Sequence, residues 1–190
     1  RMQINPTKIT DFGRTNSELE AFWLFCMFVA GKNSDHAAAS LARLLKKVSS
    51  TPFKYLAYLD ENELHNTLVA SRIGQYARLV KGVTQSLQID LRNASLDELL
   101  DVYGVGPKTA RFFLLHSRPN CECAVLDTHI LRWLESVDVN HGHKSTPQNK
   151  KEYERLEKIF IELSRAHFPK MSVADIDLLL WSKMSGRLND

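Results

Sequence analysis

The sequence predicts an all-α protein. Apolar residues recur at helical spacing along nearly the whole chain, whereas alternating apolar and polar runs long enough for a sheet are missing. Two pairs have the S-x-x-E spacing of a capping box, Ser17 with Glu20 and Ser95 with Glu98, and each precedes an apolar run. At 190 residues the chain can bury a core in one domain or in two interlocked subdomains.

The expected helices follow one another with short connections. The first, from Ser17 to about Ala30, is apolar on almost all sides, as expected of a helix buried in a core. Ser34 or Asp35 is expected to cap the second, over 37–48. Further helical patterns cover 52–58, 60–70, 73–87, 96–103, 107–116, 130–137, 151–167 and a last segment capped at Ser172 that ends near Met184. The polar stretch 140–151 is typical of a surface loop.

A Gly-x-Gly turn joins the segments 96–103 and 107–116. Gly104 stops the first helix, and Pro107 suits the first turn of the second, where its missing N–H costs nothing. Backbone N–H groups at such a turn point to one place, and the second helix adds the positive end of its dipole. The pattern indicates an anion site, although the glycines alone also fit a purely structural turn.

Two further patterns give the turn a context. The segment L-L-D-V-Y-G-V-G-P-K-T-A resembles the helix-hairpin-helix motif, which holds a DNA backbone without reading bases. Nineteen positions after Lys108, in V-L-D-T-H-I-L-R-W, stands Asp127. The combination resembles the helix-hairpin-helix-GPD superfamily of DNA glycosylases, in its lyase-competent branch. The C-terminal D-I-D-L-L-L-W-S-K-M-S-G-R is similar to the ending of the archaeal-type 8-oxoguanine DNA glycosylase/lyases.

The resemblance covers about 17–187 and implies a division of the fold. In that family two helical subdomains flank a cleft. Here the middle subdomain would be 17–120, with the hairpin, and the second would combine 1–16 with 121–190. Some relatives hold an iron–sulfur cluster with four cysteines near the C-terminus. No cysteine follows Cys123, so no cluster is expected.

The chemistry expected of Lys108 and Asp127 follows from their residue types. Breaking the bond between a sugar and its base builds positive charge at the sugar, which a carboxylate stabilises. An amine can attack C1′, form a Schiff base and promote β-elimination of the 3′ phosphate. A place at the positive end of a helix favours a neutral, reactive amine. Each residue also has a plainer interpretation, Lys108 as a phosphate contact and Asp127 as a helix cap. The resemblance implies that Lys108 is the nucleophile and Asp127 the assisting carboxylate.

The resemblance also implies which residues meet the DNA backbone. The main chain of Gly104, Val105 and Gly106 is expected to hold a phosphate. No metal or other cofactor is expected, apart from a monovalent cation that the family binds at this hairpin. Lys32 and Asn33 lie in the loop whose equivalent enters the duplex when a base is flipped out. A polar interhelical loop is the alternative interpretation of that segment.

Other residues are candidates for contacts to DNA or to the flipped base. His129 and Arg132 follow Asp127 on the same expected helix and could contact DNA or simply be solvated. Trp181, in the C-terminal segment, and Phe28 are expected to wall the base, together with other aromatic residues of the first helix, Phe22, Trp23 and Phe25. Trp181 also fits an amphipathic helix that buries Leu178 and Leu179.

Composition sets outer bounds on these interpretations. A net charge of +3 and a pI near 8.8 permit nucleic-acid binding without demanding it. The three cysteines argue against a disulfide framework. Cys121 and Cys123 could be combined with His141 and His143 as a zinc site, but neither pair has the usual spacing. The sequence has neither a long apolar run nor the apolar core of a signal peptide at its N-terminus. We therefore expect no membrane partner and an intracellular location, in the cytoplasm, nucleoid or nucleus.

The function predicted from these patterns is base-excision repair. The protein is expected to act as a monomer on double-stranded damaged DNA, to remove an oxidised base, 8-oxoguanine above all, and to cleave the abasic site. Two alternatives stay open at this point. One is a glycosylase/lyase for oxidised pyrimidines, which would use the same Lys/Asp pair, and the other is a non-catalytic helix-hairpin-helix DNA-binding protein.

Overall fold

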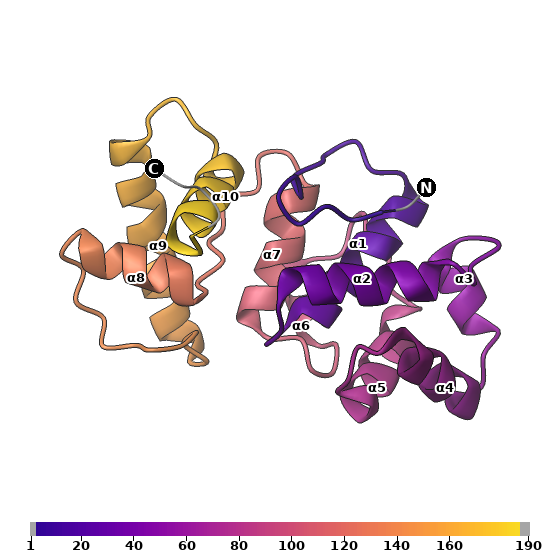
Figure 1. The fold of residues 1–190 in the computed structure, drawn as a ribbon. Helices are drawn as coiled ribbons and strands as arrows, with labels where there is room; N and C mark the ends of the chain where they lie inside the picture. The colour runs from indigo at the N-terminus through magenta and orange to yellow at the C-terminus, as the bar shows by residue number, and fades with distance from the viewer. Residues whose placement is uncertain (1–2, 187–190) are drawn as a thin grey trace. The chain divides into compact units, whose positions relative to one another are not determined.

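The computed structural model describes residues 3–186, and within that range the regular structure consists of ten α-helices without a strand. This confirms the predicted fold class. The contacts along the chain divide it into two compact units, residues 1–105 and residues 106–190. Figure 1 labels the helices. None of the described helices is long and apolar enough to cross a membrane.

The first unit is built around its most apolar helix. It contains α1 (Asn16–Val29), α2 (Ser34–Leu45), α3 (Pro52–Ala57), α4 (Glu61–Ser71), α5 (Tyr76–Ser86) and α6 (Leu96–Leu100). Helix α1 packs against α2, α3 and α5, and its residues 21–28 are all buried. The indole N–H of Trp23 donates a hydrogen bond of 2.8 Å to the Ser86 hydroxyl on α5. The single polar atom of this aromatic core is therefore satisfied.

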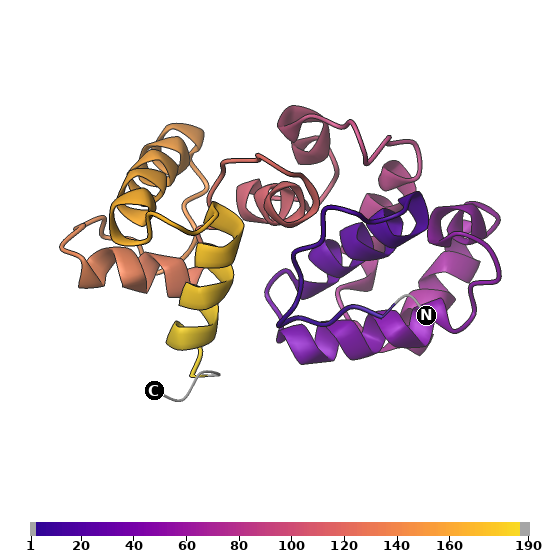
Figure 2. The ribbon, with the colours of Figure 1, turned by 90° about the horizontal axis from the view of Figure 1, so that it is seen from above.

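The second unit contains four helices, α7 (Pro107–Ser117), α8 (Thr128–Ser136), α9 (Lys150–His167) and α10 (Val173–Met184). Helix α10 packs against α7, α8 and α9, as Figure 2 allows the reader to follow. The rings of Trp133 on α8 and Phe160 on α9 meet edge to face at a centroid distance of 5.5 Å. Such an aromatic pair adds to the stabilisation from area burial alone.

Several helix starts differ from those predicted. The capping box of α1 pairs Thr15 with Glu18, not Ser17 with Glu20. The prediction was wrong because the Glu20 carboxylate accepts a hydrogen bond of 2.8 Å from the Phe53 N–H at the start of α3. Helix α5 begins at Tyr76 because Gly74 and Gln75 have positive φ angles of 77° and 54°, which end a helical pattern.

Other caps were identified correctly from the sequence. Ser95 and Glu98 form the predicted capping box of α6, and Ser172 caps α10. Asp127 caps α8. For α2 the cap is Asn33, one position before the two candidates, because its side chain accepts from the N–H groups of Asp35 and His36.

The division into units also differs from the predicted one. The N-terminal segment was expected to belong with 121–190, but its residues pack on α1. The Arg14 guanidinium lies 4.1 Å from the centre of the Phe22 ring and donates to the carbonyl oxygens of Ile9 and Asp11. Helix α7 in turn belongs to the second unit, because its His116 is hydrogen-bonded to Asp177 of α10.

Candidate active site

At the N-terminus of α7, no side chain of the described residues caps the first-turn N–H groups, and a lysine lies in that turn. Its N-cap is Gly106, which has no side chain to accept from the first-turn N–H groups. Pro107 occupies the first helical position and Lys108 follows it, partly buried. A helix start without a side-chain cap leaves its donors and its partial positive charge available to an anion.

The two hairpin glycines differ in whether their surroundings would tolerate a larger residue. Gly104 has a φ of +77°, and a Cβ placed there would come within 2.6 Å of the Arg78 side chain. Gly106 has a φ of −98°, and the nearest atom to a Cβ there is Oε1 of Gln148 at 3.8 Å, an ordinary contact. The chain's own packing therefore requires glycine at 104 and would accommodate a Cβ at 106.

Arg78 holds the first half of the hairpin, a role that sequence reasoning missed. Its guanidinium donates to the Gly104 carbonyl at 3.2 Å, to the Met27 carbonyl of α1 at 2.9 Å and to the Gln75 side chain at 2.8 Å. The main chain at Gly104 is thereby tied to the end of α1. Because Arg78 lies on another helix and far from Gly104 in the sequence, no local pattern predicts this contact.

Asp127 lies at the N-terminus of α8, where it is predicted to act in catalysis. Its Oδ1 accepts both cap bonds, from the N–H groups of His129 at 2.8 Å and Ile130 at 2.9 Å. The cap therefore occupies one carboxylate oxygen and does not use Oδ2. The segment before it is fixed by Tyr153 of α9, whose hydroxyl donates to the Ala124 carbonyl at 2.6 Å and accepts from the Leu126 N–H at 3.1 Å.

The electrostatic surroundings of Asp127 connect it to Lys108. Burial raises the pKa of Asp127 above its ordinary value of 3.8, and the charge of Asp177 raises it further. The Ile130 N–H and the charges of His129 and Lys108 lower the same pKa. Lys108 and Asp127 thus lie close enough for their charges to interact, within one unit of the fold.

A buried pair behind this carboxylate was also missed from the sequence. Asp177 on α10 and His116 on α7 are both buried, and their Oδ2 and Nε2 atoms are 3.0 Å apart. A signal was present, because Asp177 interrupts the otherwise apolar face of D-I-D-L-L-L-W. A buried carboxylate needs a partner, and here the imidazole provides it.

The structure places the remaining DNA-contact candidates without testing them. Arg132 is exposed on α8, and His129 is partly buried, with no hydrogen-bond partner for its Nδ1 among the described residues. Asn33 uses its side-chain oxygen as the cap of α2. Lys32 is partly buried, and its Nζ would lie 3.1 Å from a Cβ on Gly74. Their contacts to DNA stay predictions.

The two base-recognition candidates differ in exposure. Trp181 is partly exposed on α10, one turn beyond Asp177. Phe28 is fully buried in α1, as are Phe22 and Trp23. A contact between Phe28 and a base would require neighbouring side chains to move. Arg187, the last residue of the C-terminal sequence pattern, lies outside the described residues.

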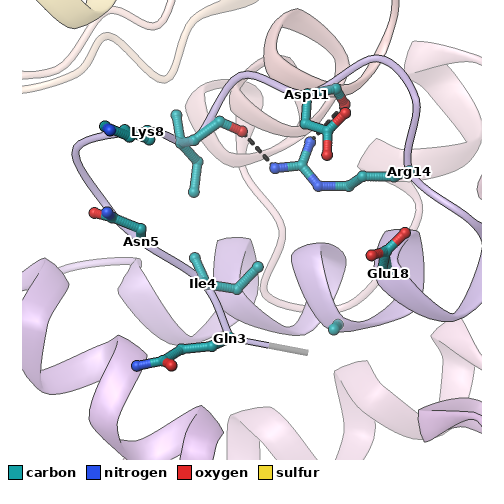
Figure 3. A pocket seen from close by; sticks show the side chains of 9 residues that line it. Gln3, Ile4, Asn5, Lys8, Asp11, Arg14 and Glu18 are labelled. Atoms are coloured by element: carbon teal, nitrogen blue, oxygen red, sulfur yellow. Dashed lines mark hydrogen bonds between the residues drawn. The ribbon is translucent and has the colours of Figure 1, made fainter. Parts of the chain in front are cut away.

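A cavity of about 140 Å³ opens elsewhere, at the N-terminal segment of the first unit. Figure 3 shows Arg14 and Asp11 among the side chains at this cavity, and the Arg14 guanidinium donates to the Ile9 carbonyl. The cavity is lined by Gln3, Ile4, Asn5, Lys8, Ile9, Asp11, Arg14, Glu18 and Ala21. It contains none of the predicted site residues.

Among residues 3–186 no group of three or more histidine, cysteine or acidic side chains is placed to hold a metal ion.

Comparison with solved structures establishes the fold. The chain is similar to the Methanocaldococcus jannaschii 8-oxoguanine glycosylase/lyase in complex with a 15mer DNA containing 8-oxoguanine, with a TM-score of 0.74 and 18% identity over 96% of this chain and 90% of that one. The 8-oxoguanine DNA glycosylase of Thermotoga maritima gives a TM-score of 0.70 and 20% identity, over 93% and 84%. No model of a known protein family matches the sequence.

Proposed function

We propose that this protein is a DNA glycosylase and abasic-site lyase that removes 8-oxoguanine from double-stranded DNA, acting as a monomer. The observation that carries the proposal is the pairing of Lys108 with Asp127 at two helix N-termini of one unit, close enough for their charges to interact. The fold supports it, because the similar M. jannaschii and T. maritima structures are 8-oxoguanine glycosylases.

Asp127 is proposed to stabilise the sugar cation that develops as the base leaves. Both cap bonds go to Oδ1, so the carboxylate is held in one orientation while Oδ2 is not engaged by the cap. Burial of the group, which raises its pKa, also means that its charge is weakly screened by water. A preorganised, poorly solvated carboxylate is an effective electrostatic catalyst.

Lys108 is proposed to form the covalent intermediate. Its neutral Nζ attacks C1′, the bond from C1′ to the base breaks, and the base leaves with a proton. Opening of the sugar ring gives an iminium between Nζ and C1′. The iminium acidifies the C2′ proton, and its removal expels the 3′ phosphate by β-elimination. Water then releases the lysine from the shortened sugar.

The start of α7 is proposed to bind a phosphate of the damaged strand. Gly106 leaves space there and no side chain caps the first-turn donors. A monovalent cation at this hairpin would be held by carbonyl oxygens, and the Gly104 carbonyl would have to share its oxygen with the positively charged Arg78 guanidinium. The proposed reaction has no step that uses a cation.

Trp181 is proposed to stack on the flipped base. Its partial exposure leaves surface for an aromatic contact, and it stands one turn from Asp177 on α10. Stacking by itself does not distinguish 8-oxoguanine from guanine. That distinction requires an acceptor for the N7–H that only the oxidised base carries.

The decisive experiment measures single-turnover base release on otherwise identical duplexes that contain 8-oxoguanine, thymine glycol or uracil. We expect 8-oxoguanine to be released fastest and borohydride to trap a protein–DNA adduct during that reaction. Faster release of thymine glycol would reassign the substrate to oxidised pyrimidines and leave the lyase mechanism standing. Binding of all three duplexes without any base release would identify a non-catalytic DNA-binding protein.

A further inference from the structure

The connection between α7 and α8 carries two cysteines that the proposed reaction does not use. The sulfur atoms of Cys121 and Cys123 are 3.6 Å apart, and neither forms a disulfide. A disulfide requires about 2.05 Å between its sulfurs. A movement of about 1.5 Å would therefore join this pair.

The two thiols are not equivalent. Cys121 is partly exposed, and the hydrogen bond that it shares with Cys123 lowers its pKa, with help from the charge of Arg118 against the effect of burial. Cys123 is buried, and the same hydrogen bond together with burial raises its pKa far above the ordinary range. An accessible sulfur with thiolate character is the one that reacts with oxidants. Cys121 therefore has the properties of the sulfur that reacts with the oxidant, and Cys123 has those of the resolving thiol beside it.

The contacts that hold the two cysteines in place also differ. The Cys123 sulfur contacts the Arg111 carbonyl at 3.4 Å, and the next residue, Ala124, donates its N–H to Glu157 at 2.9 Å. Glu157 is itself held by Arg111 at 2.7 Å. Cys123 is thus attached to both α7 and α9. The approach of the two sulfurs would come mainly from Cys121, which lies nearer the start of the connection that follows α7.

We propose that Cys121 and Cys123 form a modification site, at which a peroxide converts the two thiols into a reversible intramolecular disulfide. The Cys121 thiolate attacks the peroxide, the O–O bond breaks, hydroxide leaves and Cys121 becomes a sulfenic acid. The Cys123 thiol then attacks that sulfur, loses its proton, and the S–O bond breaks to release water. Two electrons pass from the thiols to the peroxide, and a thiol reductant reverses the change.

The test counts free thiols of the full chain in denaturant after exposure to increasing hydrogen peroxide. The reduced protein has three thiols. We expect the pair to be lost together, with a mass decrease of two hydrogen atoms per chain and full recovery with a thiol reductant. Cys26 serves as the internal control, because it is completely buried and burial raises its pKa. It should stay reduced throughout.

Single variants assign the order of events. Cys123→Ser should stop at a sulfenic acid on Cys121 that reacts with dimedone, and Cys121→Ser should keep Cys123 reduced at the same peroxide concentrations. In the native reduced protein, phenylarsine oxide, which needs two neighbouring thiols, should bind one equivalent, and neither variant should bind it.

Three results would overturn the proposal. The wild-type chain could keep all its thiols, it could form disulfides between two chains, or it could accumulate sulfinic acid at Cys121 while Cys123 stays reduced. Since the readout is thiol content and not base release, the outcome is independent of the proposed DNA chemistry.

Discussion

Helices α7 and α8 of the second unit begin in opposite ways. Helix α7 starts at a glycine that gives its first-turn N–H groups no side-chain acceptor, and a lysine follows in that turn. Helix α8 starts at Asp127, whose carboxylate accepts from two of the first N–H groups. A cation at the positive end of a helix is unfavourable for stability, and the partial burial that raises the pKa of Asp127 disfavours its ionised form.

The difference suggests that the two starts are adapted to one another and to a ligand. The negative carboxylate of Asp127 offsets the positive lysine, and the uncapped α7 start is left for an anion. Lys108 is therefore a candidate for function, because a purely structural helix start gains stability from an acidic residue in its first turn and not from a lysine.

The largest effect is expected from Lys108→Gln. The amide cannot form a Schiff base, so borohydride trapping and strand cleavage should be lost, whereas affinity for the damaged duplex should be retained. The measurement is the yield of protein–DNA adduct on a denaturing gel. Lys158→Gln, at an exposed lysine of α9, is the matched control and should trap as the wild type does. Efficient trapping by Lys108→Gln would mean that another amine is the nucleophile.

The next effect concerns the α8 start. Asp127→Asn keeps an oxygen that can cap the helix and removes the charge, so single-turnover base release should fall by roughly 100-fold or more, equivalent to ~3 kcal/mol of transition-state stabilisation. Unchanged base release in Asp127→Asn would reduce Asp127 to a helix cap.

The same variant has a consequence for stability with a definite sign. The pKa of Asp127 is raised in the folded state, so ionisation of this carboxyl disfavours folding at any pH above its ordinary value of 3.8. Asn removes that cost. The Tm of Asp127→Asn at neutral pH should therefore equal or exceed that of the wild type, with the difference fading as the pH falls below that value. A clearly lower Tm at neutral pH would indicate that the charge stabilises the fold.

Substitution of the two hairpin glycines should have different consequences: a change at 104 should lower the stability of the fold, and a change at 106 should weaken DNA binding. Gly104→Ala forces a left-handed residue against Arg78 and should lower the free energy of unfolding by about 1–2 kcal/mol. Gly106→Ala adds a Cβ that the structure accommodates with an ordinary contact to Gln148. It should leave the Tm almost unchanged and weaken binding to every duplex by roughly tenfold, about 1.4 kcal/mol, whatever the sequence. Equal binding by Gly106→Ala and the wild type would place the phosphate elsewhere.

The smallest effect is a shift in the pH profile. If base release requires the Asp127 carboxylate, the rate should fall toward acid pH as this group protonates at its raised pKa. Asp177→Asn removes a charge that contributes to that raised pKa, while its amide oxygen can still accept from His116. The acid limb should therefore move to lower pH with the plateau retained. An unmoved limb would show that another group controls it.

Much of the fold followed from local patterns in the sequence. The predicted helices all appear because their apolar spacing, glycine stops and caps such as Ser95 and Asp127 act within one or two turns of chain. Where those signals were ambiguous, a distant partner decided. Glu20 could have capped α1, but the N–H of Phe53 takes its carboxylate and leaves the cap to Thr15.

The sequence by itself also predicted Lys108 and Asp127 as a catalytic pair, and a hairpin directly before the helix that carries Lys108. It contained no information on which glycine the chain's own packing requires, because that depends on Arg78 arriving from another helix. Only the tertiary structure brought Asp177 near Asp127 and hydrogen-bonded Asp177 to His116. It also placed the Cys121 sulfur beside that of Cys123 and buried Cys123 more deeply than Cys121. Charge interactions and burial are set by distances across the fold, and no spacing along a chain specifies them.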